Sequence, residues 1–99
     1  MRGTKNYFVY IMANTSGSTL YVGFSGSFER RVMQHKTKTL PGFSAKYNTS
    51  KLVYFETAAS AVAAIAREKV IKGWTRKKKM RLIKTQNPSF RDLFDDYDH

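Results

Sequence analysis

Two neighbouring stretches, Tyr7-Phe8-Val9-Tyr10-Ile11-Met12 and Thr19-Leu20-Tyr21-Val22-Gly23-Phe24, decide the fold. Both are rich in the β-branched and aromatic residues that favour strands. The intervening residues 13–18 are small or polar turn formers, so we predict an antiparallel hairpin. The first stretch is apolar at successive positions, as expected for a strand at the centre of a sheet or covered on both faces.

The remaining elements follow from turn signals and capping residues. Ser27 is a suitable N-cap for a helix from Phe28 to about Lys36, and residues 37–50 have the composition of a loop. We then expect a strand over Leu52–Glu56, a helix from Thr57–Ser60 to Lys72 that stops at Gly73, and a helix from Arg76 to about Thr85 with Thr75 as N-cap and Asn87-Pro88 as its end. The order β-β-α-β-α-α predicts an α+β fold in which helices flank a three-stranded antiparallel sheet.

Length and composition indicate one domain over residues 1–99, with a core at about 6–93 and an acidic, frayed tail at 94–99. The chain is 41% hydrophobic and 14% aromatic, which excludes a disordered protein. No apolar run is long enough to span a membrane, and no leader sequence is evident. Because there is no cysteine, disulfides and thiolate metal sites are excluded, and we expect a cytoplasmic protein.

The net charge of +11 points to a polyanionic partner. Half of the 18 Lys and Arg residues lie between Arg67 and Lys84, with Glu68 as the one acid among them. Arg76-Lys77-Lys78-Lys79 places like charges at adjacent and i,i+3 positions, which weakens a free helix. A solvated helix face is the ordinary explanation, but we favour a nucleic-acid-facing surface over it, with an anionic membrane as a distant alternative.

Glu68 is the first candidate for chemistry. It falls on the helical stripe of Ala61, Ala64, Ile65 and Ile71, so its carboxylate is expected at the edge of the core. A carboxylate in such a place needs a partner. Two interpretations remain open here: a salt bridge to Lys72 four residues later, or a Mg²⁺ ligand that acts together with water and a substrate phosphate.

Arg31 and His35 lie four residues apart and therefore share one face of the predicted helix. The guanidinium suits a phosphate, and a histidine suits general acid–base chemistry near neutral pH. Equally, the first is an ordinary surface charge and the second an ordinary helix-end residue. Tyr10 and Tyr21 are likewise core or interface residues as often as catalytic ones.

Several segments, taken together, resemble those of the GIY-YIG nucleases, in particular the small single-domain bacterial type. The resemblance runs from Tyr7 to about Leu93. The segments are Phe8-Val9-Tyr10, Tyr21-Val22-Gly23, Phe28 to Lys36, Lys46-Tyr47-Asn48, Ala66 to Trp74, and Asn87-Pro88 through Asp92-Leu93. The short motif alone is weakly specific, whereas the ordered series is not.

The resemblance implies roles for these residues. Tyr10 and Tyr21 would line the cleft, and one of them would help to activate the attacking water. Arg31 would hold the scissile phosphate, and His35 would lie one helical turn from it. Glu68 would bind one Mg²⁺ or Mn²⁺ ion. Further nucleic-acid contacts are expected from Arg30, Lys46, Arg76, Lys77, Lys78, Lys79 and the late asparagine, Asn87.

The expected function is therefore a metal-dependent endonuclease of low sequence specificity, acting on DNA rather than RNA, with repair or recombination as its setting and no obligate protein partner. Two positions depart from the family pattern, because Phe8 replaces a glycine and Phe24 a basic residue. They favour the alternative of a catalytically weak DNA- or RNA-binding module with the same fold. A ribosome- or RNA-associated protein ranks third.

Overall fold

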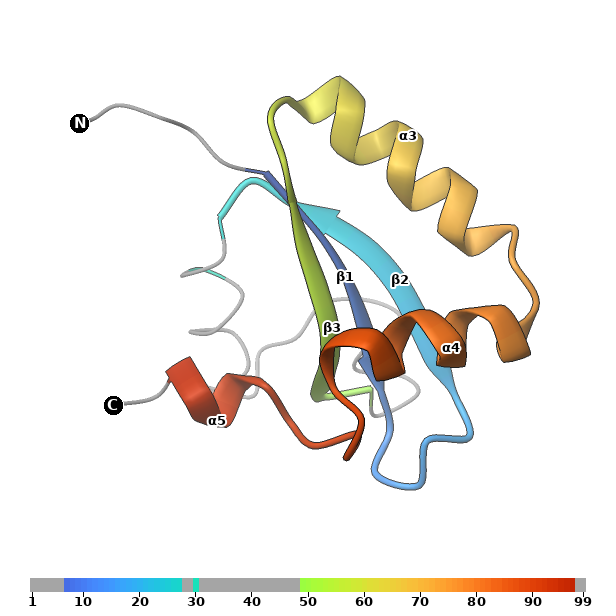
Figure 1. Cartoon of the computed structure of the whole chain (residues 1–99). Coiled ribbons are helices and arrows are strands. Elements are labelled where there is room, and N and C mark those ends of the chain that lie inside the picture. The colour runs from blue at the N-terminus through green and yellow to red at the C-terminus, as the bar shows by residue number, and fades with distance from the viewer. Residues whose placement is uncertain (1–6, 28–29, 31–48, 98–99) are drawn as a thin grey trace.

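The strands form one antiparallel sheet in the order β2-β1-β3. The computed structural model describes residues 7–27, 30 and 49–97 (Figure 1). Its strands are β1 (Tyr7–Ala13), β2 (Leu20–Ser25) and β3 (Lys51–Ala58), and its helices are α3 (Ala61–Lys72), α4 (Arg76–Gln86) and α5 (Phe94–Tyr97). The predicted α+β class and the hairpin of β1 and β2 are confirmed. The helix predicted over 28–36 lies almost wholly outside the described residues.

β1 occupies the centre of the sheet, which explains its apolar side chains on both faces. Tyr10 lies opposite Gly23 of β2 and opposite Phe55 of β3. A register shift at Ile11/Met12 adds one residue to β3 and bends the end of that strand.

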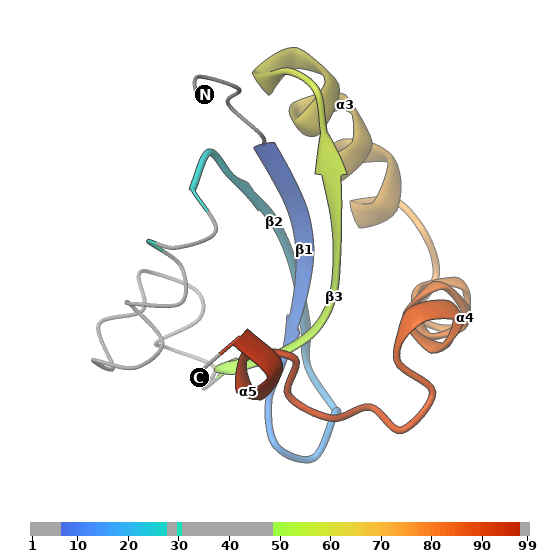
Figure 2. The same ribbon diagram turned by 60° about the vertical axis from the view of Figure 1, so that its left-hand side comes forward.

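Successive side chains of β1 alternate between two separate cores. Val9, Ile11 and Ala13 pack with residues of α3 and α4, whereas Tyr10 and Met12 pack with the segment that leads into α5. Figure 2 shows the sheet between these layers, with α3 and α4 on one side and α5 on the other. We call the first side the helix side and the second the tyrosine side.

Caps define the helix ends. Ser60 accepts a hydrogen bond from the backbone N–H of Ala63 and starts α3, so the prediction of a helix beginning as early as Thr57 was wrong. That residue and the next still belong to β3. Gly73 ends α3 and Thr75 caps α4 by accepting from the N–H of Lys78, both as predicted. The backbone of Gly73 is in the right-handed region, with φ −79°, so the end of α3 does not depend on a left-handed conformation.

The outer edge of β3 is closed by the last residue of α4 and by the segment that follows it. Gln86 accepts from the Phe55 N–H at 3.0 Å and donates to the Phe55 carbonyl at 2.8 Å. Asp92 accepts from the Leu52 N–H at 3.1 Å, and the Leu93 N–H donates to the Leu52 carbonyl at 2.7 Å. These contacts satisfy edge groups that would otherwise be available to another strand.

The prediction of a frayed tail at 94–99 was wrong over residues 94–97, which form α5. The Asp92 carboxylate accepts a hydrogen bond from the N–H of Phe94, at the start of α5. Phe94 and Leu93 are almost fully buried and complete the core on the tyrosine side. The prediction failed because the segment is mostly acidic, although Leu93 and Phe94 within it are apolar and pack in the core.

Candidate functional site

Tyr10 and Tyr21 come from paired strands and lie together on the tyrosine side. Their ring centroids are 6.3 Å apart at an interplanar angle of 49°. Tyr10 is only 4% exposed, whereas Tyr21 is half-buried and packs at the margin of the same core. The tyrosine pair therefore presents one phenol ring that is anchored and one that reaches the surface.

Gly23 makes the close arrangement possible. A Cβ atom at this position would lie 2.7 Å from the hydroxyl oxygen of Tyr10 and 3.0 Å from Cε2 of Tyr21. The first distance is shorter than a side-chain Cβ tolerates, so any residue larger than glycine would displace the tyrosine pair. The glycine of this motif thus serves side-chain packing.

Glu68 lies on the helix side, at the edge of the core as predicted. It shares a stripe of α3 with Ala64 and Ile71, and it is 8% exposed. Its Oε2 is 2.5 Å from the Nζ of Lys72, so the salt bridge considered from the sequence is present. The lysine side chain is 53% exposed, and it can leave the carboxylate by rotating into solvent.

The sheet stands between Glu68 and the tyrosine pair. α3 packs on all three strands, and both β2 and β3 are edge strands. Because Gln86, Asp92 and Leu93 cover the edge of β3, a substrate in contact with both sides would have to pass around the edge of β2.

The donor set at Glu68 fits a hard divalent ion held largely by water. Among the described residues, no group of three or more His, Cys, Asp or Glu side chains is arranged to hold a metal. A single carboxylate is sufficient for Mg²⁺, which keeps several water ligands and binds substrate phosphate. Lys72 would have to yield its place to the ion.

Arg30 lines a small polar pocket at the end of β2. Its N–H donates to Oγ of Ser27 at 3.1 Å, which is the contact expected of the predicted N-cap. Ser25, Gly26 and Ser27 line the pocket with Arg30, whose side chain is exposed. Arg31, His35 and Lys46 lie outside the described residues, and their roles stay predictions.

The four basic residues at the start of α4, Arg76 to Lys79, lie in different environments. The guanidinium of Arg76 donates to the carbonyls of Gly17 and Ser18, which fastens the helix to the β1–β2 turn. The ammonium of Lys78 lies 4.3 Å from the centroid of Trp74. Lys79 is half-buried, whereas Lys77 is exposed. The four residues therefore do not form one phosphate-binding set.

Asn87 is a structural residue in this fold, and its surroundings do not support the predicted nucleic-acid contact. Its side-chain amide donates to the carbonyls of Val53 at 3.0 Å and Arg91 at 2.8 Å, and its oxygen accepts from the Arg91 N–H at 3.2 Å. With 2% of its surface exposed, it has no face to offer a ligand.

From the sequence, the whole basic helix from Arg76 to Lys84 was expected to contact the nucleic-acid backbone, but two finer features were missed. Arg81 and Lys84 share a groove with Lys77, and the i, i+4, i+7 spacing of these three cations was the signal that predicts a common face. The second feature is a polar network on the helix side, in which Glu56 accepts from Tyr54 at 2.6 Å and from Arg67 at 2.8 and 3.3 Å. No sequence spacing predicts that network, because it joins a strand to a helix.

The network shifts the ionisation of its members. Burial, followed by the hydrogen bond to Glu56 and its charge, raises the pKa of Tyr54 to about 12. Burial also acts to raise the pKa of Glu56, but the hydrogen bonds from Arg67 and Tyr54 outweigh it, and the net pKa is lowered.

The family comparison agrees with the motifs. Residues 6–81 match the model of the GIY-YIG catalytic domain, and the chain therefore belongs to the GIY-YIG family. Its relatives include small proteins named UPF0213. One from Haloquadratum walsbyi is 39% identical over 80 residues, which is 77% of this chain and 84% of that protein. One from Staphylococcus aureus is 40% identical over 83 residues, or 80% and 95% of the two chains.

A solved structure supports the fold. The solution NMR structure of the UPF0213 protein of Bacillus halodurans aligns with a TM-score of 0.57 at 23% identity, over 89% of this chain and 93% of that one. Within the part of the chain that the structure describes, no helix has the length and apolar character needed to cross a bilayer.

Proposed function

We propose that this protein is a GIY-YIG endonuclease that hydrolyses phosphodiester bonds of DNA with low sequence specificity, in repair or recombination. The observation that carries the proposal is the packed pair Tyr10–Tyr21 closed over Gly23 in a chain that matches the catalytic domain over residues 6–81. The proposal depends on the arrangement of these side chains as well as on the fold, because folds alone do not specify activity.

Each residue has a defined part in the proposed reaction. Tyr21, the more exposed ring of the pair, takes the proton of the attacking water while its own phenolic proton passes to His35 or, by way of the Tyr10 hydroxyl, to solvent. The water oxygen forms a bond to phosphorus while the P–O bond to the leaving oxygen breaks, and that oxygen then takes a proton from a solvent water. Arg31 offsets the negative charge that grows on the phosphate oxygens.

Glu68 is the residue that would hold a Mg²⁺ or Mn²⁺ ion. Such an ion would polarise the scissile phosphate and stabilise the leaving oxygen, and this requires the phosphate to lie at the edge of β2, where it can reach both Glu68 and Tyr21. The exposed Lys72 releases the carboxylate for this purpose, and in the absence of the ion it neutralises a charge that is costly to bury alone.

A binding module without effective catalysis is the second candidate. Two observations favour this alternative. Phe24 is 38% exposed at a position where several family members have a cation, and Glu68 is held in an ion pair with Lys72. Salt-sensitive binding without metal-dependent nicking would identify it.

The test is nicking of supercoiled plasmid in Mg²⁺, in Mn²⁺ and in EDTA by the wild type, Glu68→Ala and Lys72→Gln. We expect metal-dependent nicking that Glu68→Ala abolishes and Lys72→Gln retains, since the latter keeps the carboxylate and removes only its ion-pair partner. Circular dichroism should show that both variants are folded. Wild-type rates in folded Glu68→Ala would overturn the metal assignment, and no nicking by the wild type would leave the binding module as the function.

A further inference from the structure

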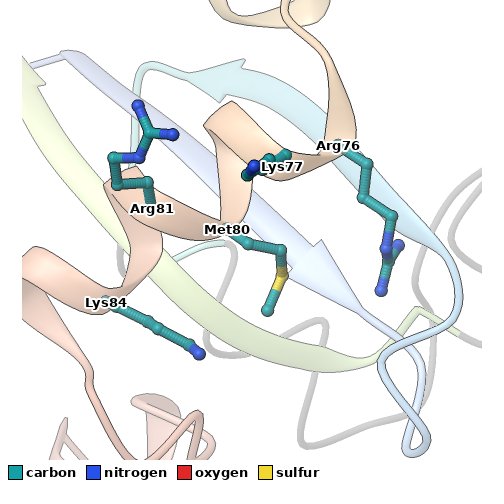
Figure 3. A pocket seen from close by; sticks show the side chains of 5 residues that line it. All are labelled: Arg76, Lys77, Met80, Arg81 and Lys84. Atoms are coloured by element: carbon teal, nitrogen blue, oxygen red, sulfur yellow. The ribbon is translucent and has the colours of Figure 1, made fainter.

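A stripe of cations follows the exposed flank of α4. Lys77, Arg81 and Lys84 line an open groove together with Arg76 and Met80. Figure 3 shows Met80 at the centre of this groove, between Arg76 and Lys84. We use the name α4 stripe for Lys77, Arg81 and Lys84 alone, because Arg76 is already engaged with the β1–β2 turn.

The charges of α4 are not explained by the stability of the helix. The sequence of α4 contains no acid, and its first turn carries cations next to the positive end of the helix dipole. Among the described residues, no carboxylate pairs with any member of the α4 stripe, since the ion pairs of this region join Arg67 to Glu56 and Lys72 to Glu68. The repulsion is therefore unrelieved by the described part of the fold.

We propose that the α4 stripe binds the phosphodiester backbone of duplex DNA, as a surface separate from the tyrosine pair. This inference deepens the proposed function but requires only that the protein binds DNA. The residues proposed to bind DNA differ from the consecutive basic run, because they include Arg81 and Lys84 and leave out Arg76, Lys78 and Lys79.

The spacing suits consecutive phosphates. Seven residues of helix separate Lys77 from Lys84, which is about 10.5 Å along the axis at 1.5 Å per residue. DNA advances about 3.4 Å along its axis for each phosphate of one strand, so the length of the α4 stripe equals about three steps of the duplex when the helix and the DNA axis are parallel.

The chemistry of the groove favours nucleic acid over an anionic membrane. A helix that lies on a membrane buries large apolar side chains among the lipids. The large apolar residues that are exposed in the described chain are Phe24, Val62 and Val70, and none belongs to α4. Met80 is half-buried and packs against the core on the helix side, so it has little surface to insert.

A binding experiment in EDTA tests the proposal without any cleavage. The affinity for a fluorescein-labelled 20-base-pair duplex would be measured by anisotropy from 50 to 200 mM NaCl. The test variant is Lys77→Gln/Lys84→Gln, and the matched control is Lys69→Gln/Lys79→Gln, which removes the same charge. Lys79 is the discriminating position, because it belongs to the basic run but lies about 160° around the axis from Lys77.

The expected result is a change in salt dependence that only the test variant shows. Loss of two phosphate contacts should reduce the slope of log K against log[salt] by about 1.8, so the effect of raising salt from 50 to 200 mM becomes about tenfold smaller. Equal slope changes in both variants, or no duplex binding by the wild type at 50 mM salt, would overturn the proposal. So would binding to phosphatidylserine vesicles that depends on Lys77 and Lys84 in the absence of duplex binding.

The two proposals fail in different ways. A stripe-dependent slope without nicking would refute the nuclease and retain the DNA-binding surface. Nicking with identical slopes in the two lysine variants would do the reverse.

Discussion

Replacement of Asn87 by alanine should destabilise the domain strongly without a direct loss of DNA contacts. The change strands the carbonyl of Val53, which is inside the structure, and releases the carbonyl and N–H of Arg91. A buried group left without a partner costs about 1–3 kcal/mol, and each of the other two hydrogen bonds contributes about 0.5–1.5 kcal/mol. Since water can reach the exposed Arg91, we expect a total of about 2–4 kcal/mol.

Thermal and urea unfolding measure this loss. For a domain of this size 1 kcal/mol corresponds to about 4–8 °C, so the melting temperature of Asn87→Ala should fall by at least about 10 °C. Gln86→Ala is the matched control, because it too removes side-chain hydrogen bonds to β3, two in number, but at an exposed position where water replaces them. A melting temperature within about 2 °C of wild type, together with weakened DNA binding by Asn87→Ala, would refute the structural role.

Two further predictions concern side-chain packing and pH. Gly23→Ala should lower nicking activity, because the added Cβ atom displaces the hydroxyl of Tyr10. Gly26→Ala should have little effect, because the nearest atom to its Cβ would be 3.3 Å away. Initial nicking rates and melting temperatures of the two variants test this, and equal rates would contradict it. The raised pKa of Tyr54 means that the folded state holds this proton more tightly than the unfolded state, so its contribution is complete below pH 10 and is lost as pH rises to about 12. The lowered pKa of Glu56 acts in the opposite sense and removes stability as pH falls below 4.5. Urea midpoints of wild type and Tyr54→Phe, measured at intervals from pH 9 to 12, should converge, and a constant difference would show that the tyrosine proton is not involved.

Local signals were sufficient to predict most of the fold. The hairpin, the centre strand and both caps of the helix pair depend on neighbours in sequence, such as Thr75 and the N–H of Lys78. The end of β3 and the ordered tail depend instead on contacts over long separations. Asp92 satisfies Leu52 across 40 residues, and no spacing rule in the sequence predicts that bond.

The candidate site was predictable by residue type but not by surroundings. The motif identified Tyr10 and Tyr21, and the structure places them together. Asn87 has a hydrogen-bonding side chain that suits either a ligand or a buried backbone, and only burial separates those roles. Similarly, four consecutive basic residues look equivalent in sequence although the turn carbonyls occupy Arg76 and the Trp74 ring lies beneath Lys78.

Strand alternation also determines which side of the sheet is affected by the unusual residue Phe24. Phe24 lies opposite Val9 in the register, and therefore on the helix side with Glu68 rather than with the tyrosine pair. The basic residue that several family members carry at this position would thus act on the side where the carboxylate lies. In this chain α4 packs on that same side and carries Lys77, Arg81 and Lys84. Positive charge is therefore supplied to the helix side by a helix rather than by the strand, so the loss of one cation from β2 does not by itself argue against phosphate binding there.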